Sequence, residues 1–122
     1  MTLLASLVGA ASALAYVNWP GYMFESGHSS LNTAATAITP ANAGGLAPAW
    51  AAPFTHGGFE ASPVVYNGSI YIGDKNGIFY QLDETRGAII HQITLGKETG
   101  CGSFAYGVED TATVAPDLSR TS

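Results

Sequence analysis

The chain has few basic residues. Only four of its 122 residues are Lys or Arg, against nine Asp or Glu, and the formal net charge is −5. Binding to the phosphate backbone of a nucleic acid requires clustered positive charge, so this composition argues against nucleic acid as a partner. The basic residues are also scattered along the chain, at Lys75, Arg86, Lys97 and Arg120. Hydrophobic residues make up 47% of the chain, which is too many for an intrinsically disordered protein.

Motifs for metal, phosphate and acyl-transfer chemistry are absent as well. The sequence contains no Cys-x-x-Cys, His-Glu-x-x-His or Gly-x-Ser-x-Gly motif, and no phosphate-binding Gly-rich loop. The only cysteine is Cys101, and no base lies near it in the sequence. A lone cysteine in an exported protein more often pairs with another cysteine than acts as a nucleophile. The sequence therefore predicts no catalytic, cofactor-binding or metal-binding residue in this chain.

Four weaker candidates are better explained by structural roles. Residues 74–77 have the oxygen ligands and glycine of a calcium loop, but they lack EF-hand spacing and favour a hairpin turn. His56 and Glu60 are separated by a stretch with two glycines, which predicts a solvated loop and not one helix face. His28 lies among serines, where a capping or hydrogen-bonding role is favoured. His91 is expected to be a packing or surface residue.

The strongest structural pattern lies at residues 61–93. Four runs rich in Val, Ile, Tyr and Phe alternate with turn signals, and such residues suit a pleated, half-buried surface. Asn67-Gly68 is a strong hairpin signal, because a type I′ turn needs φ > 0 at both central residues. Gly77 and Gly87 give the same freedom to two longer turns. The pattern predicts an antiparallel meander with strands at 61–66, 69–73, 77–82 and 88–93.

A meander of this size buries too little surface to be stable alone. Its apolar residues are numerous enough to line more than one face, so neighbours on both faces are expected. Short strands with regular turns fit a sandwich, a barrel or a propeller. Periodicity alone does not choose among these three architectures.

Residues 1–15 are apolar and end in Ala13-Leu14-Ala15, as the hydrophobic region and cleavage site of a secretory signal do. The usual basic segment before such a run is absent, so the true start is expected upstream of Met1. A buried helix or a membrane anchor is the alternative, but the run is shorter than the roughly 20 residues that span a bilayer. We expect cleavage after Ala15 and a secreted or periplasmic protein.

The residues of the meander follow the order Ser62-Pro63-Val64-Val65, Asn67-Gly68, Ile70-Tyr71-Ile72-Gly73, Asn76-Gly77, Tyr80-Gln81-Leu82-Asp83 and Gly87. This order resembles one blade of a pyrroloquinoline-quinone-type (PQQ-like) β-propeller, of the quinoprotein alcohol dehydrogenase-like kind. Asp83 and Gly87 match the family pattern that locks neighbouring blades. The chain departs from that pattern where the family has Ala, Thr and Trp, and carries instead Gln81, Arg86 and His91.

Residues 16–60 resemble the N-terminal lead of secreted PQQ-like propellers. The matching order is Trp19-Pro20, Tyr22, Gly27-His28-Ser29-Ser30 and then Ile38-Thr39-Pro40-Ala41-Asn42-Ala43-Gly44, Leu46, Pro48-Ala49-Trp50. The resemblance implies a strand near 46–54 that belongs to the last blade and closes the ring. The residues themselves predict a short helix that Thr39 caps, with Pro40 in its first turn and Gly44-Gly45 at its end.

Residues 94–107 read as a polar loop, and residues 108–122 resemble the first strand and turn of a second blade. The expected fold is therefore all-β: an N-terminal arm and a first four-stranded blade, truncated at the start of the next blade. The remaining blades of the same chain would be its partners, and a cysteine there would pair with Cys101.

The resemblance leaves two functions open. We favour a non-catalytic or uncharacterised propeller that serves binding or assembly, because the locking pattern is degenerate. The alternative is the N-terminal part of a PQQ-dependent alcohol dehydrogenase, an oxidoreductase that uses PQQ and calcium. The family's quinone and calcium contacts lie in later blades, so none is assigned to a residue of this chain.

Overall fold

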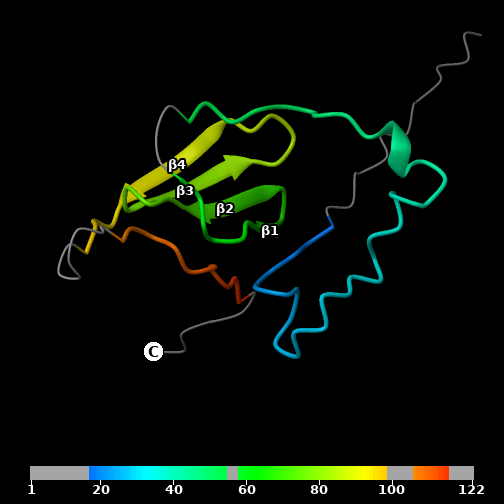
Figure 1. Ribbon diagram of the computed structural model, residues 1–122, viewed down its shortest axis with the longest axis horizontal. Coiled ribbons are helices and arrows are strands. Elements are labelled where there is room, and N and C mark those ends of the chain that lie inside the picture. The colour runs from blue at the N-terminus through cyan, green and yellow to red at the C-terminus, as the bar shows by residue number, and fades with distance from the viewer. Residues whose placement is uncertain (1–16, 55–57, 99–105, 116–122) are drawn as a thin grey trace, which may run out of the picture.

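The computed structural model describes residues 17–54, 58–98 and 106–115. Within them lies one antiparallel sheet with the strand order β1-β2-β3-β4 (Figure 1). The strands are β1 (Val64–Tyr66), β2 (Ser69–Gly73), β3 (Ile78–Asp83) and β4 (Ile89–Thr94), and the short 3-10 helix η1 (Ala43–Gly45) precedes them. The predicted all-β class and the four-stranded meander are confirmed.

The three predicted turns form as expected. Asn67 and Gly68 have φ values of 47° and 75°, so both central residues of the β1–β2 hairpin have the positive φ of a type I′ turn. Tyr66 pairs with Ser69 directly across this turn. Gly77 and Gly87 also have positive φ, at 76° and 66°. These turn residues explain why the chain can reverse direction between each pair of successive strands.

The first strand is shorter than the predicted range of 61–66, because β1 begins only at Val64. Pro63 has no N–H to give to a neighbouring strand, and the Ser62 N–H donates to the Thr111 hydroxyl oxygen instead. The outer edge of β1 is covered by Trp19, whose backbone N–H and C=O bond to Val65 at 2.7 and 2.9 Å. The boundaries of β3 and β4 differ from prediction by one residue.

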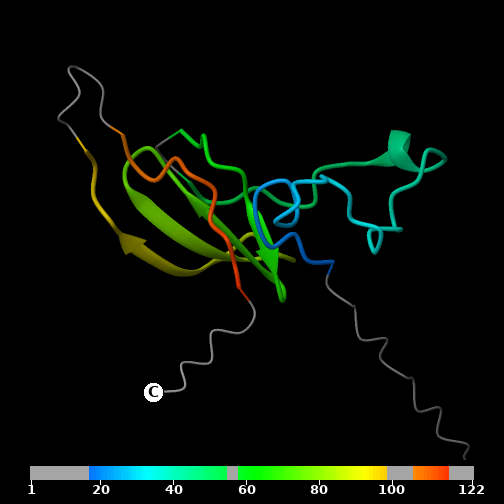
Figure 2. The same ribbon diagram turned by 90° about the horizontal axis from the view of Figure 1, so that it is seen from below.

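The two faces of the sheet are partly covered by segments that precede and follow it in the chain. On one face, the rings of Phe54 and Phe59 pack against Tyr80, with centroids 4.8 and 6.4 Å away. On the other face, Val108 lies so close to Gly73 that a Cβ there would overlap the valine side chain. Figure 2 shows the segment 106–115 running across the sheet. The buried hydrophobic residues among those described are Ala61, Val64, Tyr80 and Leu82.

The lead before the sheet contains little regular structure. The helix that Thr39 was expected to cap is reduced to the three residues of η1, which ends at Gly45, within the expected Gly44-Gly45. Before it, the Thr39 carbonyl accepts the N–H groups of Asn42 and Ala43 at 3.1 and 2.9 Å. The Asn42 side chain accepts the Thr39 N–H at 2.7 Å, so the expected start is a single bonded turn. Residues 46–54 then return toward the sheet (Figure 1) without joining a strand.

The chain after β4 is anchored by backbone bonds to the turn before β3 and to the lead. Leu95 donates to the Gly77 carbonyl, Val108 donates to the Asp74 carbonyl, and Val114 donates to the Pro20 carbonyl. The described part of the proposed second-blade segment, 108–115, is irregular chain with bends at 108 and 110, outside any strand. The ring-closing strand and the second blade therefore stay predictions. No helix in the described parts of the chain is long and apolar enough to cross a membrane; the proposed signal, residues 1–15, lies outside them.

Candidate functional site

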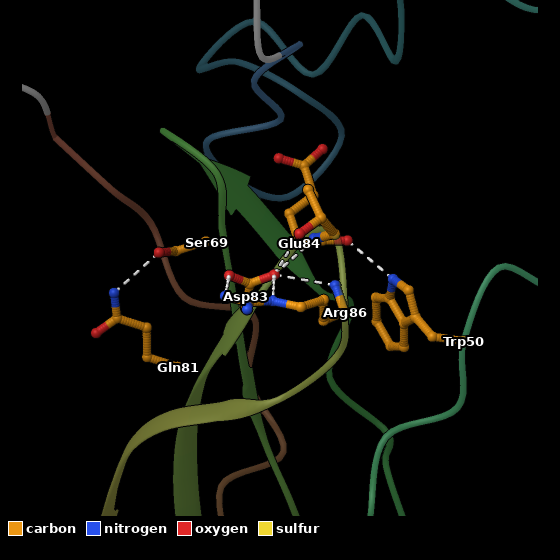
Figure 3. Close-up of polar contacts among 7 residues, drawn as sticks. Trp50, Ser69, Gln81, Asp83, Glu84 and Arg86 are labelled. Carbon is orange, nitrogen blue, oxygen red and sulfur yellow. Dashed lines mark hydrogen bonds and ion pairs between the residues drawn. The ribbon is translucent and has the colours of Figure 1, made fainter. Parts of the chain in front are cut away.

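The turn between β3 and β4, residues 83–87, is a densely bonded polar site at one end of the sheet, and we call it the docking turn (Figure 3). Asp83 organises it. Its Oδ1 accepts the backbone N–H groups of Thr85 and Arg86, at 3.0 and 2.9 Å, and the Thr85 hydroxyl at 2.6 Å. The Gly87 N–H donates to the Asp83 carbonyl at 2.8 Å. A short Asp side chain that bonds the backbone two and three residues ahead is a common way to fix such a turn.

An ion pair closes the same turn. Nη2 of Arg86 lies 3.0 Å from Oδ2 of Asp83. The Arg86 guanidinium and the Thr85 hydroxyl hold the pKa of Asp83 well below its usual value, and the carboxylate in turn raises the pKa of Arg86. The Arg86 side chain is 77% exposed, so the pair fixes local geometry and contributes little to global stability.

Trp50 docks onto this turn from outside the four strands. Its Nε1–H donates to the Glu84 carbonyl at 2.9 Å, as Figure 3 shows. Its ring lies against Gly87, where an added Cβ would overlap Cε3 of the indole. The contact therefore combines a hydrogen bond from the indole N–H with apolar packing of the indole ring, which makes Trp effective at holding two segments together.

Gly87 is required at its position for two independent reasons. Its φ of 66° lies in the left-handed region that residues with a Cβ avoid. The space beside its Cα is also filled by Trp50. A glycine here gives both the turn conformation and an open backbone surface for the indole.

The docking turn is tied to the β1–β2 hairpin at the same end of the sheet. The Glu84 N–H donates to the Gly68 carbonyl at 3.0 Å. Nearby, Nε2 of Gln81 donates to the hydroxyl of buried Ser69 at 2.9 Å (Figure 3). These two bonds make the end of the sheet a firm support for Trp50.

Sequence reasoning identified only half of this site. Asp83 and Gly87 matched a pattern that joins neighbouring blades, and the structure brings both to the docking turn. Trp50 was included only in the predicted strand near 46–54, and its partner on the docking turn was missed. The available signal was the indole itself, because a Trp in a lead segment needs an apolar surface to cover it and a partner for its N–H.

Residues 74–77 form the hairpin turn between β2 and β3, as predicted. The Asp74 side chain is fully buried. Its Oδ1 accepts the N–H groups of Asn76 and Ile78, at 3.0 and 2.8 Å, and its Oδ2 accepts the Tyr80 hydroxyl at 3.0 Å. Burial and this bond to the carboxylate raise the pKa of Tyr80. Both carboxylate oxygens of Asp74 are thus bonded within the turn and the strand that follows it.

The remaining sequence candidates lie apart from the docking turn. Glu60 forms an ion pair with Lys75, which raises the pKa of the lysine. His91 is exposed on β4, as expected of a surface residue. The backbone N–H of His28 donates to the Glu25 carbonyl, and its ring meets Tyr22 edge to face. The capping or hydrogen-bonding role of the His28 side chain stays a prediction. His56 and Cys101 lie outside the described residues.

No family model, no curated protein and no solved structure matches this chain. The site is therefore defined by its own geometry. An indole N–H bonded to a turn carbonyl, with its ring against a glycine, holds two distant segments of chain together. Among the described residues, no three His, Cys, Asp or Glu side chains gather in a group that could hold a metal ion.

Proposed function

We propose that the chain is part of an exported PQQ-like β-propeller in which residues 61–93 form one blade, and that this propeller serves binding or assembly and not catalysis. The observation that carries the proposal is the contact of Trp50 with the docking turn, where its N–H bonds the Glu84 carbonyl and its ring packs on Gly87. Asp83 and Gly87 match the pattern by which blades of the resembled family lock together. A Trp from outside the blade, bound at this turn, would serve as such a lock.

The position of Trp50 in the chain supports the same proposal. Trp50 lies in the segment 46–54, which resembles the part of the lead that completes the last blade. In a closed ring the last blade is the neighbour of the first, so its Trp would meet the first blade's turn. Closing a ring in this way removes open sheet edges.

The distribution of buried residues supports a larger assembly. Only four hydrophobic residues of the described chain are buried, and none belongs to β4. So small a core makes the chain only marginally stable by itself. Neighbouring blades would cover the rest of its apolar surface.

Three described carboxylates of the sheet and its turns are each bonded to a side chain of this chain. Asp74 is bonded to Tyr80, Asp83 is paired with Arg86, and Glu60 is paired with Lys75. A tight calcium site gathers six to eight oxygens around one point, whereas these three acids belong to separate turns. We therefore assign no chemical step to this chain, whether the whole protein is a binding propeller or, in the alternative, a PQQ-dependent alcohol dehydrogenase.

Reading the coding sequence downstream of Ser122 tests the proposal. We expect further repeats of the blade pattern, each with an Asp and a Gly spaced as Asp83 and Gly87 are. A reading frame that ends without another such repeat would overturn it. An Asp-Tyr-Asp calcium set, a pair of adjacent cysteines or a haem-binding Cys-x-x-Cys-His would favour the dehydrogenase instead.

Calorimetry on the protein encoded by the whole reading frame then separates the two functions. A binding or assembly propeller should show no saturable uptake of PQQ in the presence of calcium. Saturable uptake, together with alcohol-dependent reduction of a dye, would establish the dehydrogenase and refute the non-catalytic role.

A further inference from the structure

Residues 21–30 form a compact loop in the lead, which we call the arm loop. Three backbone bonds close it: Phe24 N–H to the Gly21 carbonyl, His28 N–H to the Glu25 carbonyl and Ser30 N–H to the Met23 carbonyl. Four of its residues other than glycine have positive φ, namely Met23 (52°), Phe24 (83°), His28 (53°) and Ser30 (56°). Positive φ is costly for residues with a Cβ, and such residues often cluster where a loop presents groups to a ligand.

The carboxylate of Glu25 is held in place inside this loop. Its Oε2 accepts the Gly27 N–H at 2.6 Å, and its Oε1 accepts the Ser29 N–H at 3.0 Å. These backbone bonds lower the pKa of Glu25, so the group keeps its negative charge to lower pH than an ordinary glutamate. The Ser29 side chain also bonds this carboxylate. A carboxylate has about four lone-pair positions, so the loop does not use all of them.

A cavity of about 370 Å³ lies between the arm loop and the segment that contains Thr113. Its lining residues include two aromatic residues, Tyr22 and Phe24, together with Glu25 and His28. The size of the cavity suits a small organic molecule. No Lys or Arg is among the lining residues, so the cavity offers no strong partner for an anion.

Both rings are held by other aromatic groups. Phe24 packs on Trp19 with centroids 5.3 Å apart, and Tyr22 meets His28 edge to face at 5.8 Å. Tyr22 is nevertheless 53% exposed, so it can still contact a ligand. Fixed rings lose little conformational entropy when a ligand binds.

We propose that this cavity binds an organic ammonium cation, such as a quaternary ammonium head group. Aromatic faces attract such cations through the ring quadrupole, and the fixed carboxylate of Glu25 supplies the opposite charge. The chain's net charge of −5 also attracts cations at long range. The proposal rests on the arm loop and the cavity beside it, and does not depend on the propeller assignment.

Choline and its neutral isostere 3,3-dimethyl-1-butanol, titrated at equal ionic strength into the isotopically labelled whole chain, provide the test. The two molecules have nearly the same shape, so a difference in affinity reports charge. We expect choline to bind with a Kd on the order of 1 mM and the isostere to bind about tenfold more weakly. NMR shifts of the arm-loop amides report binding, and the sheet amides report folding in the same spectra.

Two substitutions of the exposed Tyr22 test whether its aromatic ring contributes to choline binding. Tyr22→Leu keeps apolar volume but removes the quadrupole, so choline should bind about 2- to 5-fold more weakly. Tyr22→Phe keeps the quadrupole and should stay within about twofold of the parent. Equal binding of choline and the isostere, absence of choline binding, or equal effects of the two substitutions would each overturn the proposal.

Discussion

Strands β3 and β4 are neighbours of equal length, six residues each, and both carry large apolar residues, yet their burial differs sharply. In β3, Tyr80 and Leu82 are only 6% and 2% exposed, whereas no residue of β4 is buried and Ile93 is 57% exposed. The reason is position, since β3 lies between two strands and β4 forms the edge of the sheet (Figure 1). Similar residue types thus mark both strands, but the covering segments decide which strand enters the core.

The exposed apolar residues of β4 continue into the residue that follows the strand. They are Ile89, Ile90, Ile93 and Leu95. The bulge between Gln81 and Leu82 contributes to this exposure, because Gln81 pairs with His91 and Leu82 with Ile89, which leaves Ile90 without a register partner in β3. An apolar edge of this kind favours association. In the proposed propeller, adjacent blades would cover it.

A pair of truncations tests this contrast most strongly. Leu82→Ala should lower the free energy of unfolding by about 2–5 kcal/mol, because it leaves a cavity in the small core. Ile93→Ala removes a similar volume from the exposed strand and should change that free energy by no more than about 0.5 kcal/mol. Urea unfolding followed by circular dichroism measures both. Equal losses would mean that β4 is buried in solution.

Glycine substitutions compare the docking turn with Gly96, a loop position with no neighbouring atoms to clash with. Gly87→Ala should cost about 1–3 kcal/mol, since it combines positive φ with a clash against Trp50. Gly96→Ala is the matched control: its φ is 95°, but no atom lies within 4 Å of the added Cβ. Its cost should therefore reflect backbone strain alone, about 1 kcal/mol. Thermal or urea unfolding of both variants measures these costs. A larger loss of stability for Gly96→Ala than for Gly87→Ala would contradict the packing of Trp50 on the docking turn.

The indole hydrogen bond should have a smaller effect. Trp50→Phe keeps an aromatic ring against Gly87 but removes the donor to the Glu84 carbonyl, so it should cost about 1 kcal/mol. In a Trp50→Ala background, the penalty of Gly87→Ala should fall to that of Gly96→Ala, because the clash is gone. Urea unfolding of the parent chain, Trp50→Ala, Gly87→Ala and the double variant gives the coupling free energy between the two positions. A coupling near zero would show that Trp50 and Gly87 do not touch.

The lowered pKa of Asp83, in the docking turn, predicts a small change in the stability of the chain with pH. Its pKa is lower in the folded chain than the ordinary value of 3.8, so its stabilising contribution is present above that value. The contribution is lost as pH falls below 3.8 toward the lower folded pKa. Asp83→Asn should therefore flatten the decline in stability from neutral pH to acid, measured as urea midpoints against those of the parent chain. Parallel declines in the two proteins would contradict the assignment.

The sheet could be predicted largely because its signals are local. Asn67-Gly68, Gly77 and Gly87 each fix a turn through backbone freedom at a single position, and the β-branched runs between them have no competing helical pattern. The start of β1 was misplaced because Pro63 removes one donor from the ladder. The expected helix is only one short turn and η1, because the two glycines that end it follow soon after Thr39.

The candidate site could be predicted only in part because it joins residues far apart in the sequence. Asp83 and Gly87 belong to one turn, so their pattern is visible in a short window. Trp50 reaches that turn across 34 positions, and no local rule specifies such a contact. The packing of Phe54 on Tyr80 and of Val108 beside Gly73 likewise joins segments far apart in the sequence, and no local pattern predicts either contact.

The contact between Trp50 and Gly87 is the central claim, and NMR on the whole chain measures it directly. A Gly87 Hα proton beneath the indole ring should be shifted upfield by the ring current and should show nuclear Overhauser effects to the Trp50 ring protons. Trp50→Leu should return that shift to an ordinary glycine value while the β2–β3 amides keep their positions. A Gly87 Hα resonance that is already ordinary in the parent chain, and that does not respond to Trp50→Leu, would contradict the account.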